Sequence, residues 1–256
     1  MGDGNRWSRR REFAHSAAMN DAPVQELRAS TTRRKPAVRP RDAASLVLLR
    51  GAGATLEVLV GRRPLAARFM PGVYVFPGGA IDPPDRRPWM VETATEWLAP
   101  RLARAARAAL RETWEEVGVL VGRPAEAEAT SSDLSTPAEG AIERAYRRRS
   151  LAAAMDLLTY VGRAITPSHS SRRFNTRFFL ADGESVFGEP MASTELEDVR
   201  WRPLGAGDLE DGLRDVTRFM LARAVALRSG IAAGEPPLFY WGKNARRIGI
   251  CREAAR

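Results

Sequence analysis

Carboxylate side chains are concentrated in residues 111–119, whose sequence is RETWEEVGV. At about 100° per residue, Glu112, Glu115 and Glu116 fall on one face of a helix. Carboxylates held this close repel one another. A hard divalent cation such as Mg²⁺ removes that repulsion and keeps positions open for water and phosphate. The segment therefore predicts a helix that holds a metal ion.

A plainer interpretation of the same helix is a solvated charged face. In that case Arg111 would pair with Glu115, and Arg107 would pair with Glu112. Either way, a separate apolar face is available to join the core, formed by Leu102, Ala106, Ala109, Leu110, Thr113 and Val117.

A glycine turn lies upstream, in residues 70–79 with the sequence MPGVYVFPGG. The apolar part indicates a short strand, and the Gly-Gly pair lets the backbone approach a ligand closely. A strand that ends in such a turn, followed by a carboxylate helix, is suited to binding a phosphorylated ligand together with a metal ion.

The two segments together resemble the Nudix box. In that pattern a glycine, five residues, a glutamate and seven residues precede Arg-Glu-U-x-Glu-Glu-x-Gly-U, where U is bulky and apolar. Gly79 matches the first glycine, and Thr113 stands where an aliphatic residue is usual. The second half of the box is matched in order by Arg111, Glu112, Glu115, Glu116, Gly118 and Val119. On these residues the chain is identified as a member of the Nudix hydrolase superfamily.

The two halves of the box are separated by an insertion. Arg111 lies 32 residues after Gly79, where the pattern places it 14 residues after, so about 18 residues are added. Asp85 stands six residues after Gly79, where the box has its first glutamate, and Glu92 and Glu96 lie within the insertion. Which of the three acids takes the role of that glutamate is left open.

An interrupted box behind a VFPGG strand resembles the superfamily branch of the coenzyme A (CoA) and acyl-CoA diphosphatases. The likeness extends to residues 163–167 and 172–179, and covers roughly residues 42–204. It implies cleavage of CoA into 3′,5′-ADP and a phosphopantetheine product. Alternatives are another nucleotide substrate (ADP-ribose, NADH or an oxidised dNTP) or a binding module without turnover. Trp89 and Trp97 would either anchor the insertion on the core or wall a substrate pocket.

The resemblance also implies roles for the box residues. Glu112 and Glu116 would bind Mg²⁺ or Mn²⁺ directly, and Glu115 would be a further ligand or the base that activates water. A backbone carbonyl at Gly79 or its neighbour would complete the metal's coordination. Arg111 would orient a glutamate.

Residues outside the box complete the predicted site. Nudix enzymes often use a further acid from a later loop, and Glu195 is the candidate here, with Glu197 and Glu189 behind it. Four arginines are candidates for holding substrate phosphates, because a guanidinium binds phosphate through two parallel hydrogen bonds; they are Arg62, Arg63, Arg68 and Arg173.

The hydrophobic periodicity predicts an α/β fold. Strands are expected at 43–49, 56–62, 73–76, 119–121, 160–165, 176–181 and 198–203, and helices at 101–117, 139–158 and 207–228. The first two strands are joined by a glycine-rich hairpin. The resemblance implies an α/β/α sandwich around a mixed sheet, in one Nudix domain over residues 41–256 with an insertion at about 83–100.

Composition narrows the functional classes. The chain has 256 residues, of which 44% are hydrophobic, enough for a substantial core. One cysteine, Cys251, excludes an internal disulfide and a cysteine zinc site. No apolar run approaches the length of a membrane span.

The net charge of +9 is concentrated near the N-terminus. Residues 1–41 contribute +6 and the other 215 residues only +3, so a specific nucleic-acid surface is not expected. Residues 1–40 are expected to be a disordered basic tail. The expected location is cytoplasmic, or mitochondrial if this tail is a transit peptide. Met19 is a second candidate start, and a homodimer is left open.

Overall fold

A nine-stranded mixed sheet and a three-stranded sheet make up the β-structure of the fold. The computed structural model describes residues 38–93, 95, 98–125, 139–205, 207–231, 234–242 and 245–254. The strands are β1 (Arg41–Arg50), β2 (Glu57–Arg62), β3 (Tyr74–Val75), β4 (Gly78–Ala80), β5 (Leu120–Pro124), β6 (Leu151–Ala153), β7 (Thr159–Ile165), β8 (Phe174–Asp182), β9 (Val186–Phe187), β10 (Glu197–Pro203), β11 (Pro237–Trp241) and β12 (Arg246–Ile250). The α-helices are α1 (Pro100–Val117), α2 (Ala141–Arg148), α3 (Gly207–Gly212) and α4 (Asp215–Arg228). Short 3₁₀ helices are η1 (Gly53–Thr55), η2 (Pro83–Arg86), η4 (Met155–Leu157), η5 (Gly183–Ser185) and η6 (Arg252–Ala254).

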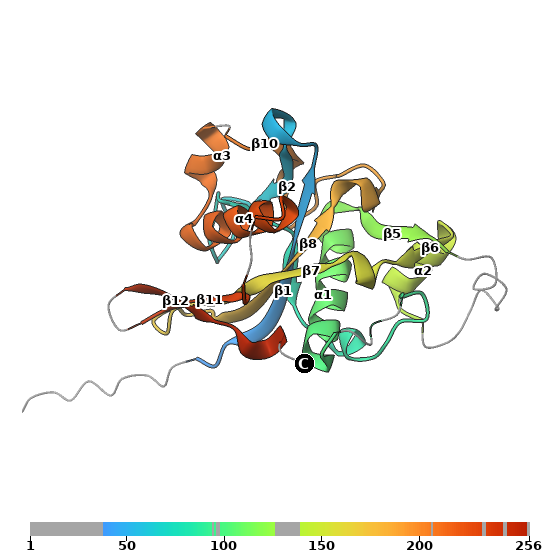
Figure 1. The fold of residues 1–256 in the computed structure, drawn as a ribbon, viewed down its shortest axis with the longest axis horizontal. Coiled ribbons are helices and arrows are strands. Elements are labelled where there is room, and N and C mark those ends of the chain that lie inside the picture. Colours follow the sequence, from blue (N-terminus) through green and yellow to red (C-terminus); the bar gives the residue numbers. More distant parts are fainter. Residues whose placement is uncertain are drawn as a thin grey trace, which may run out of the picture. The chain divides into compact units, whose positions relative to one another are not determined.

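Strand β1 carries the core on both of its faces. Leu46 and Leu48 pack into the hydrophobic cluster that includes α1, while Val47 and Leu49 pack into the cluster that includes α4. All four side chains are fully buried, and each contributes about 1.5–3 kcal/mol by leaving water. Figure 1 shows α1 and α4 on opposite sides of β1. The predicted sandwich of helices around a mixed sheet is therefore confirmed.

The large sheet has the strand order β10-β2-β1-β8-β7-β11-β12. Strand β1 runs parallel to β8 in a continuous register from Arg41↔Phe174 to Leu49↔Asp182. The pairings of β8 with β7 and of β2 with β10 are antiparallel. This mixture agrees with the prediction, which rested on hairpins interspersed with helices.

Strands β1 and β2 separate after a short shared register, and the glycine turn fills the gap. Paired residues next to the hairpin are Leu49↔Val58 and Arg50↔Glu57. Further along, β4 pairs with β1 and β3 pairs with β2. Between β3 and β4, the carbonyl of Pro77 accepts hydrogen bonds from the Leu46 amide at 3.0 Å and the Ser45 hydroxyl at 3.0 Å. The turn is thus fixed against the central strand.

The helix predicted over residues 139–158 is wrong in its second half. Helix α2 ends at Arg148, and Ser150 adopts a left-handed conformation with φ of 52°. Residues Leu151–Ala153 then form β6, which pairs with β5. The alanine-rich composition favours a helix, but strand pairing and burial outweigh that weak local preference.

The C-terminal part also differs from the prediction. The single helix expected over 207–228 is two helices, and a side chain at Gly212 would lie 2.5 Å from the Tyr74 ring. Strands β9, β11 and β12 were not predicted. The expected tail falls mainly on residues 1–37, which lie outside the described residues. The domain limits stay predictions.

Among the described residues, no helix is both long and apolar enough to cross a membrane.

Candidate active site

Helix α1 presents its box residues beside the glycine turn. Its apolar face is buried as predicted. Thr113, the departure from the box pattern, is fully buried, and its hydroxyl donates to the Ala109 carbonyl at 2.7 Å. The helix ends at Gly118, whose φ of 78° favours glycine and whose amide donates to the Trp114 carbonyl. The local structure therefore accounts both for the threonine that departs from the box pattern and for the glycine that ends the helix.

The glycine turn and α1 approach closely at two points. The Gly78 amide donates to Glu116 Oε2 at 2.7 Å. A Cβ atom at Gly79 would lie 2.5 Å from the carboxyl group of Glu112. Because any side chain at Gly79 would occupy the position of that carboxylate, the glycine is required for this arrangement.

Arg111 connects the inserted segment to the box. Its Nε and Nη2 donate to the two oxygens of Asp85 at 3.0 and 2.9 Å, and Nη2 also donates to the Ala80 carbonyl at 2.9 Å. Its Nη1 lies 2.7 Å from Glu115 and 3.0 Å from Glu112. Burial alone would lower the pKa of Arg111, but its hydrogen bonds and charge interactions with Asp85 and the glutamates raise it. Arg111 stays charged and fixes the positions of its partners.

Asp85 is the acid in the insertion that Arg111 binds. It is 0% exposed. In the sequence it follows Gly79 by six residues, the separation at which the box has its first glutamate. Glu92 instead forms two hydrogen bonds with Arg107, at 2.6 and 2.7 Å. Glu96 lies outside the described residues. Among the three acids that the sequence left open, Asp85 is the one with the box spacing from Gly79, a signal that did not settle the choice by itself.

The ion pairs of the plainer interpretation are present only in part. Arg111 does pair with Glu115, as that interpretation expected. The expected pair of Arg107 with Glu112 is wrong, because Arg107 is buried against Glu92 of the insertion. Trp89 of the insertion is also buried, within the α1 core cluster, which favours its anchoring role. Trp97 lies outside the described residues.

The positive charge near Glu112 and Glu116 does not offset the cost of burying their carboxylates. Burial raises the pKa of Glu116 to about 8, and the hydrogen bond from Gly78 offsets this only in part. Burial also raises the pKa of Glu112 to about 7, against the lowering effect of Arg111. The charge of Glu195 contributes to both increases. A divalent cation would supply the missing charge, and carboxylate oxygens are the ligands that Mg²⁺ prefers.

Glu115 occupies a different position from the other two box glutamates. Its side chain is 45% exposed and is held by Arg111. Over the part of the chain that the structure describes, no three His, Cys, Asp or Glu side chains converge as a metal-binding group. The site is therefore centred on the pair Glu112 and Glu116, with Glu115 at its edge.

The acid predicted from a later loop affects the same pair through its charge. Glu195 is exposed and follows β9, and the buried Leu196 beside it anchors the loop in the core. Its effect on the pKa values of both Glu112 and Glu116 places its charge near them. The reserve candidate Glu197 lies 3.8 Å from Arg62.

The four arginines predicted to hold phosphates are not gathered in one place. The charge of Arg63 lowers the pKa of Glu116, so it acts on that carboxylate, and the Arg63 Nε donates to the Phe69 carbonyl. Arg62 pairs with Glu197, and Arg68 is exposed on the loop after β2. Arg173 donates to two backbone carbonyls, at residues 166 and 38. Arg63 is the best placed of the four.

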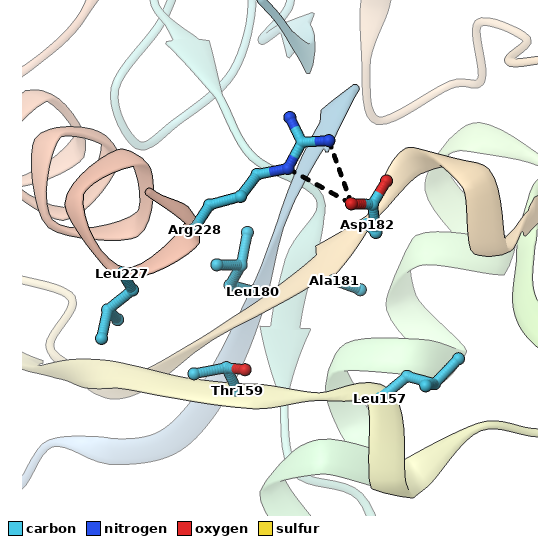
Figure 2. Close-up of a pocket in the computed structure, with 7 residues that line it drawn as sticks. All are labelled: Leu157, Thr159, Leu180, Ala181, Asp182, Leu227 and Arg228. Carbon is cyan, nitrogen blue, oxygen red and sulfur yellow. Dashed lines mark hydrogen bonds and ion pairs between the residues drawn. The ribbon is translucent and has the colours of Figure 1, made fainter. Parts of the chain in front are cut away.

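A small cavity lies apart from these residues, at the end of β8. It has a volume of about 180 Å³ and is closed on one side by the ion pair of Arg228 with Asp182, at 3.0 Å (Figure 2). No box residue lines it. We therefore do not include it in the candidate active site.

A carboxylate pair lies on a helix beside a glycine turn, next to a buried Arg–Asp pair and within an α/β/α sandwich. Such a pair could hold a divalent cation. No protein-family model matches the chain. A curated Caenorhabditis elegans protein assigned as nudix hydrolase 7 is 28% identical over 164 residues, which are 63% of this chain. The chain spans about half of that relative's length, at 50%.

A solved structure gives the clearer comparison. The crystal structure of a NUDIX hydrolase from Alicyclobacillus acidocaldarius is 35% identical, with a TM-score of 0.51. The match covers 73% of this chain and 92% of that one. The chain therefore belongs to the Nudix hydrolase family.

Proposed function

We propose that this protein hydrolyses a diphosphate linkage in a nucleoside diphosphate derivative, most favourably CoA or acyl-CoA, with Mg²⁺ or Mn²⁺. The observation that carries the proposal is the placement of Glu112 and Glu116 against the Gly78–Gly79 turn. Glu116 is buried and the Glu112 side chain is 13% exposed, and burial raises the pKa of both carboxyl groups. Arg111 with Asp85 connects the helix to the segment that follows the turn. A binding module without turnover would not need these charges.

Each residue has a role that follows from its position. Glu112 and Glu116 would hold the metal ion, which neutralises the diphosphate and lowers the pKa of bound water. Gly79 leaves space for Glu112 and exposes backbone to the ligand. Arg111 positions Glu112 and Glu115 by direct ion pairs. Glu195, in the loop between β9 and β10, is the candidate for orienting the attacking water.

The choice of CoA rests on the interrupted box. The insertion between Gly79 and Arg111 is part of the folded site, because Asp85 and Glu92 both form buried ion pairs with α1. The segment therefore supplies a buried partner for Arg111 from the position where the box has its first glutamate. Its sequence likeness to the CoA and acyl-CoA diphosphatases supports a substrate of that class.

A substrate screen tests the proposal. The purified protein would be incubated with Mg²⁺ and CoA, acyl-CoA, ADP-ribose, NADH or an oxidised dNTP, and products would be separated by chromatography. We expect CoA or acyl-CoA to give 3′,5′-ADP, and Glu116→Gln to remove that activity. Turnover of another nucleotide alone would assign the substrate elsewhere. Binding without turnover of any compound would overturn the enzymatic proposal.

A further inference from the structure

A basic pocket lies where β1 begins, next to the candidate active site. It has a volume of about 380 Å³. Five arginines are among the residues that line it: Arg39, Arg101, Arg104, Arg163 and Arg177. None of them was among the predicted substrate-binding residues. We call this cavity the basic pocket.

Two of the five arginines are neutralised by acids. Arg177 lies 3.1 Å from Asp42 and 2.8 Å from Glu253, and Arg163 lies 3.0 Å from the same Glu253. Asp42 also lines the pocket. Arg177 is buried in these pairs, whereas the Asp42 side chain is 58% exposed. The positive charge of the other three arginines is not offset by these two acids.

Two of the other three arginines lie near the N-terminus of α1, where the helix dipole disfavours positive charge. Arg101 and Arg104 lie in the first turns of α1, and the first turn contains no acidic residue. Within the described part of the chain, Arg101 and Arg39 form no ion pair, and Arg104 donates to the Pro100 carbonyl of its own helix. Cations near a helix N-terminus oppose the helix dipole. A bound anion would offset both the dipole and the mutual repulsion.

The basic pocket adjoins the catalytic residues through two elements. Ile81 lines the pocket and directly follows β4, and its amide donates to the Asp42 carbonyl at 3.0 Å. On α1, Arg104 precedes Glu112 by eight residues, which corresponds to about 12 Å along the helix axis. One ligand can therefore reach both the carboxylates and the pocket.

We propose that the basic pocket binds a phosphomonoester group at the end of the substrate remote from the cleaved bond. This inference rests on the proposed function, since it assumes a nucleoside diphosphate derivative at Glu112 and Glu116. Guanidinium groups bind phosphate oxygens through paired, charge-assisted hydrogen bonds. CoA and acyl-CoA carry such a group on the ribose, whereas ADP-ribose and NADH do not. The pocket would therefore select for the 3′-phosphorylated substrates.

Kinetics with CoA and dephospho-CoA test the inference. Wild-type protein should have a kcat/KM at least about tenfold higher for CoA, because a hydrogen bond to a charged group contributes enough for that factor. The double variant Arg101→Glu/Arg104→Glu should lose this preference through a higher KM for CoA, with dephospho-CoA little affected. Its melting temperature should be unchanged or higher, since acids are favoured at a helix N-terminus.

A matched control separates the pocket from net charge. Arg148→Glu/Arg149→Glu makes the same charge change at exposed positions at the end of α2, and it should keep the preference for CoA. Equal kcat/KM for the two substrates in wild type, or a preference that survives in the pocket variant, would overturn the inference while leaving the proposed function intact.

A binding experiment covers the case in which neither CoA compound is hydrolysed, which would overturn CoA and acyl-CoA as the proposed substrates. Calorimetry without metal would compare 3′,5′-ADP with 5′-AMP. The inference expects at least about tenfold tighter binding of 3′,5′-ADP to wild type, and loss of that difference in Arg101→Glu/Arg104→Glu. Equal binding of the two nucleotides to wild type would overturn it.

Discussion

Glu116 is the residue whose removal should affect chemistry most and stability least. Metal-dependent charge stabilisation is worth several kcal/mol, so Glu116→Gln should lower kcat by at least about 100-fold. The glutamine oxygen can still accept from Gly78, and a buried negative charge is lost. The melting temperature should therefore stay the same or rise. Steady-state kinetics and thermal melts of the two proteins check this.

Glu184→Gln is the matched control for that substitution, because Glu184 lies on η5, outside the box sequence and the inserted segment. It should leave kcat unchanged. Activity of Glu116→Gln within tenfold of wild type would remove Glu116 from the metal site.

The raised pKa values of Glu112 and Glu116 predict a pH dependence of the metal-free protein. Both carboxyl groups hold protons in the folded state at pH values where an ordinary carboxyl group, near 4.5, has lost them. Folding therefore takes up protons between about pH 4.5 and 8, and the free energy of unfolding should fall as the pH rises through that window. Thermal melts in EDTA should show the decline.

Metal should reverse the decline, because it binds the deprotonated carboxylates. The increase in melting temperature on adding Mg²⁺ should be larger at pH 8 than at pH 6. Glu116→Gln should show a weaker pH dependence in EDTA. A melting temperature that rises from pH 5 to 8 without metal would contradict the assignment of these two groups.

Asp85 should be important for both stability and activity. Asp85→Asn leaves the buried Arg111 charge without its main partner, and breaking a buried ion pair typically costs about 3–5 kcal/mol. Denaturant unfolding should show the loss, and kcat should fall because Arg111 no longer positions the glutamates. Asp82→Asn is the control, since Asp82 is half exposed and lies 3.9 Å from Arg111. Similar losses in both variants would argue against a specific role for Asp85.

At the scale of elements, the hydrophobic periodicity correctly predicted a helix whose limits and buried face are set by its own nearby residues. Helix α1 was expected at 101–117 and is observed from Pro100 to Val117, because its apolar face and Gly118 specify both the buried side and the end. The acid that binds Arg111 could not be chosen from sequence. That contact joins residues 26 apart across an insertion, and spacing alone did not distinguish three acids.

The contact between β4 and α1 gives a prediction for Gly79→Ala. The three atoms nearest to the new methyl group all belong to the flexible end of Glu112, so the fold should tolerate it. Displacing that carboxylate should lower kcat at least about tenfold, because small misplacements of catalytic groups are costly. Gly207→Ala, where a Cβ atom meets nothing within 4 Å, is the control. Unchanged kcat in Gly79→Ala would place Glu112 outside the metal site.

At the scale of the whole chain, the strand pairings that close the sheet were the least predictable part. Strands β11 and β12 extend the sheet beyond β7, and η6 follows them. Glu253 in η6 then pairs with Arg163 and Arg177, which are 90 and 76 residues away. Charges at such separations leave no periodic signal, so the composition of the C-terminal region indicated neither the strands nor the basic pocket.

The N-terminal limit of the folded unit is predicted from both sequence and contacts. Residues 1–37 lack apolar periodicity in sequence, whereas the Val38 carbonyl accepts from Arg173 at 2.7 Å and the Arg41 amide donates to the Arg173 carbonyl at 2.9 Å. Deleting residues 1–37 should therefore change the melting temperature and Mg²⁺-dependent kcat little. Deleting residues 1–40 also removes the Val38 contact and Arg39 of the basic pocket, so it should lower the melting temperature slightly and raise KM for CoA. Loss of soluble protein or of kcat in the shorter deletion would show that residues 1–37 contribute to the folded enzyme.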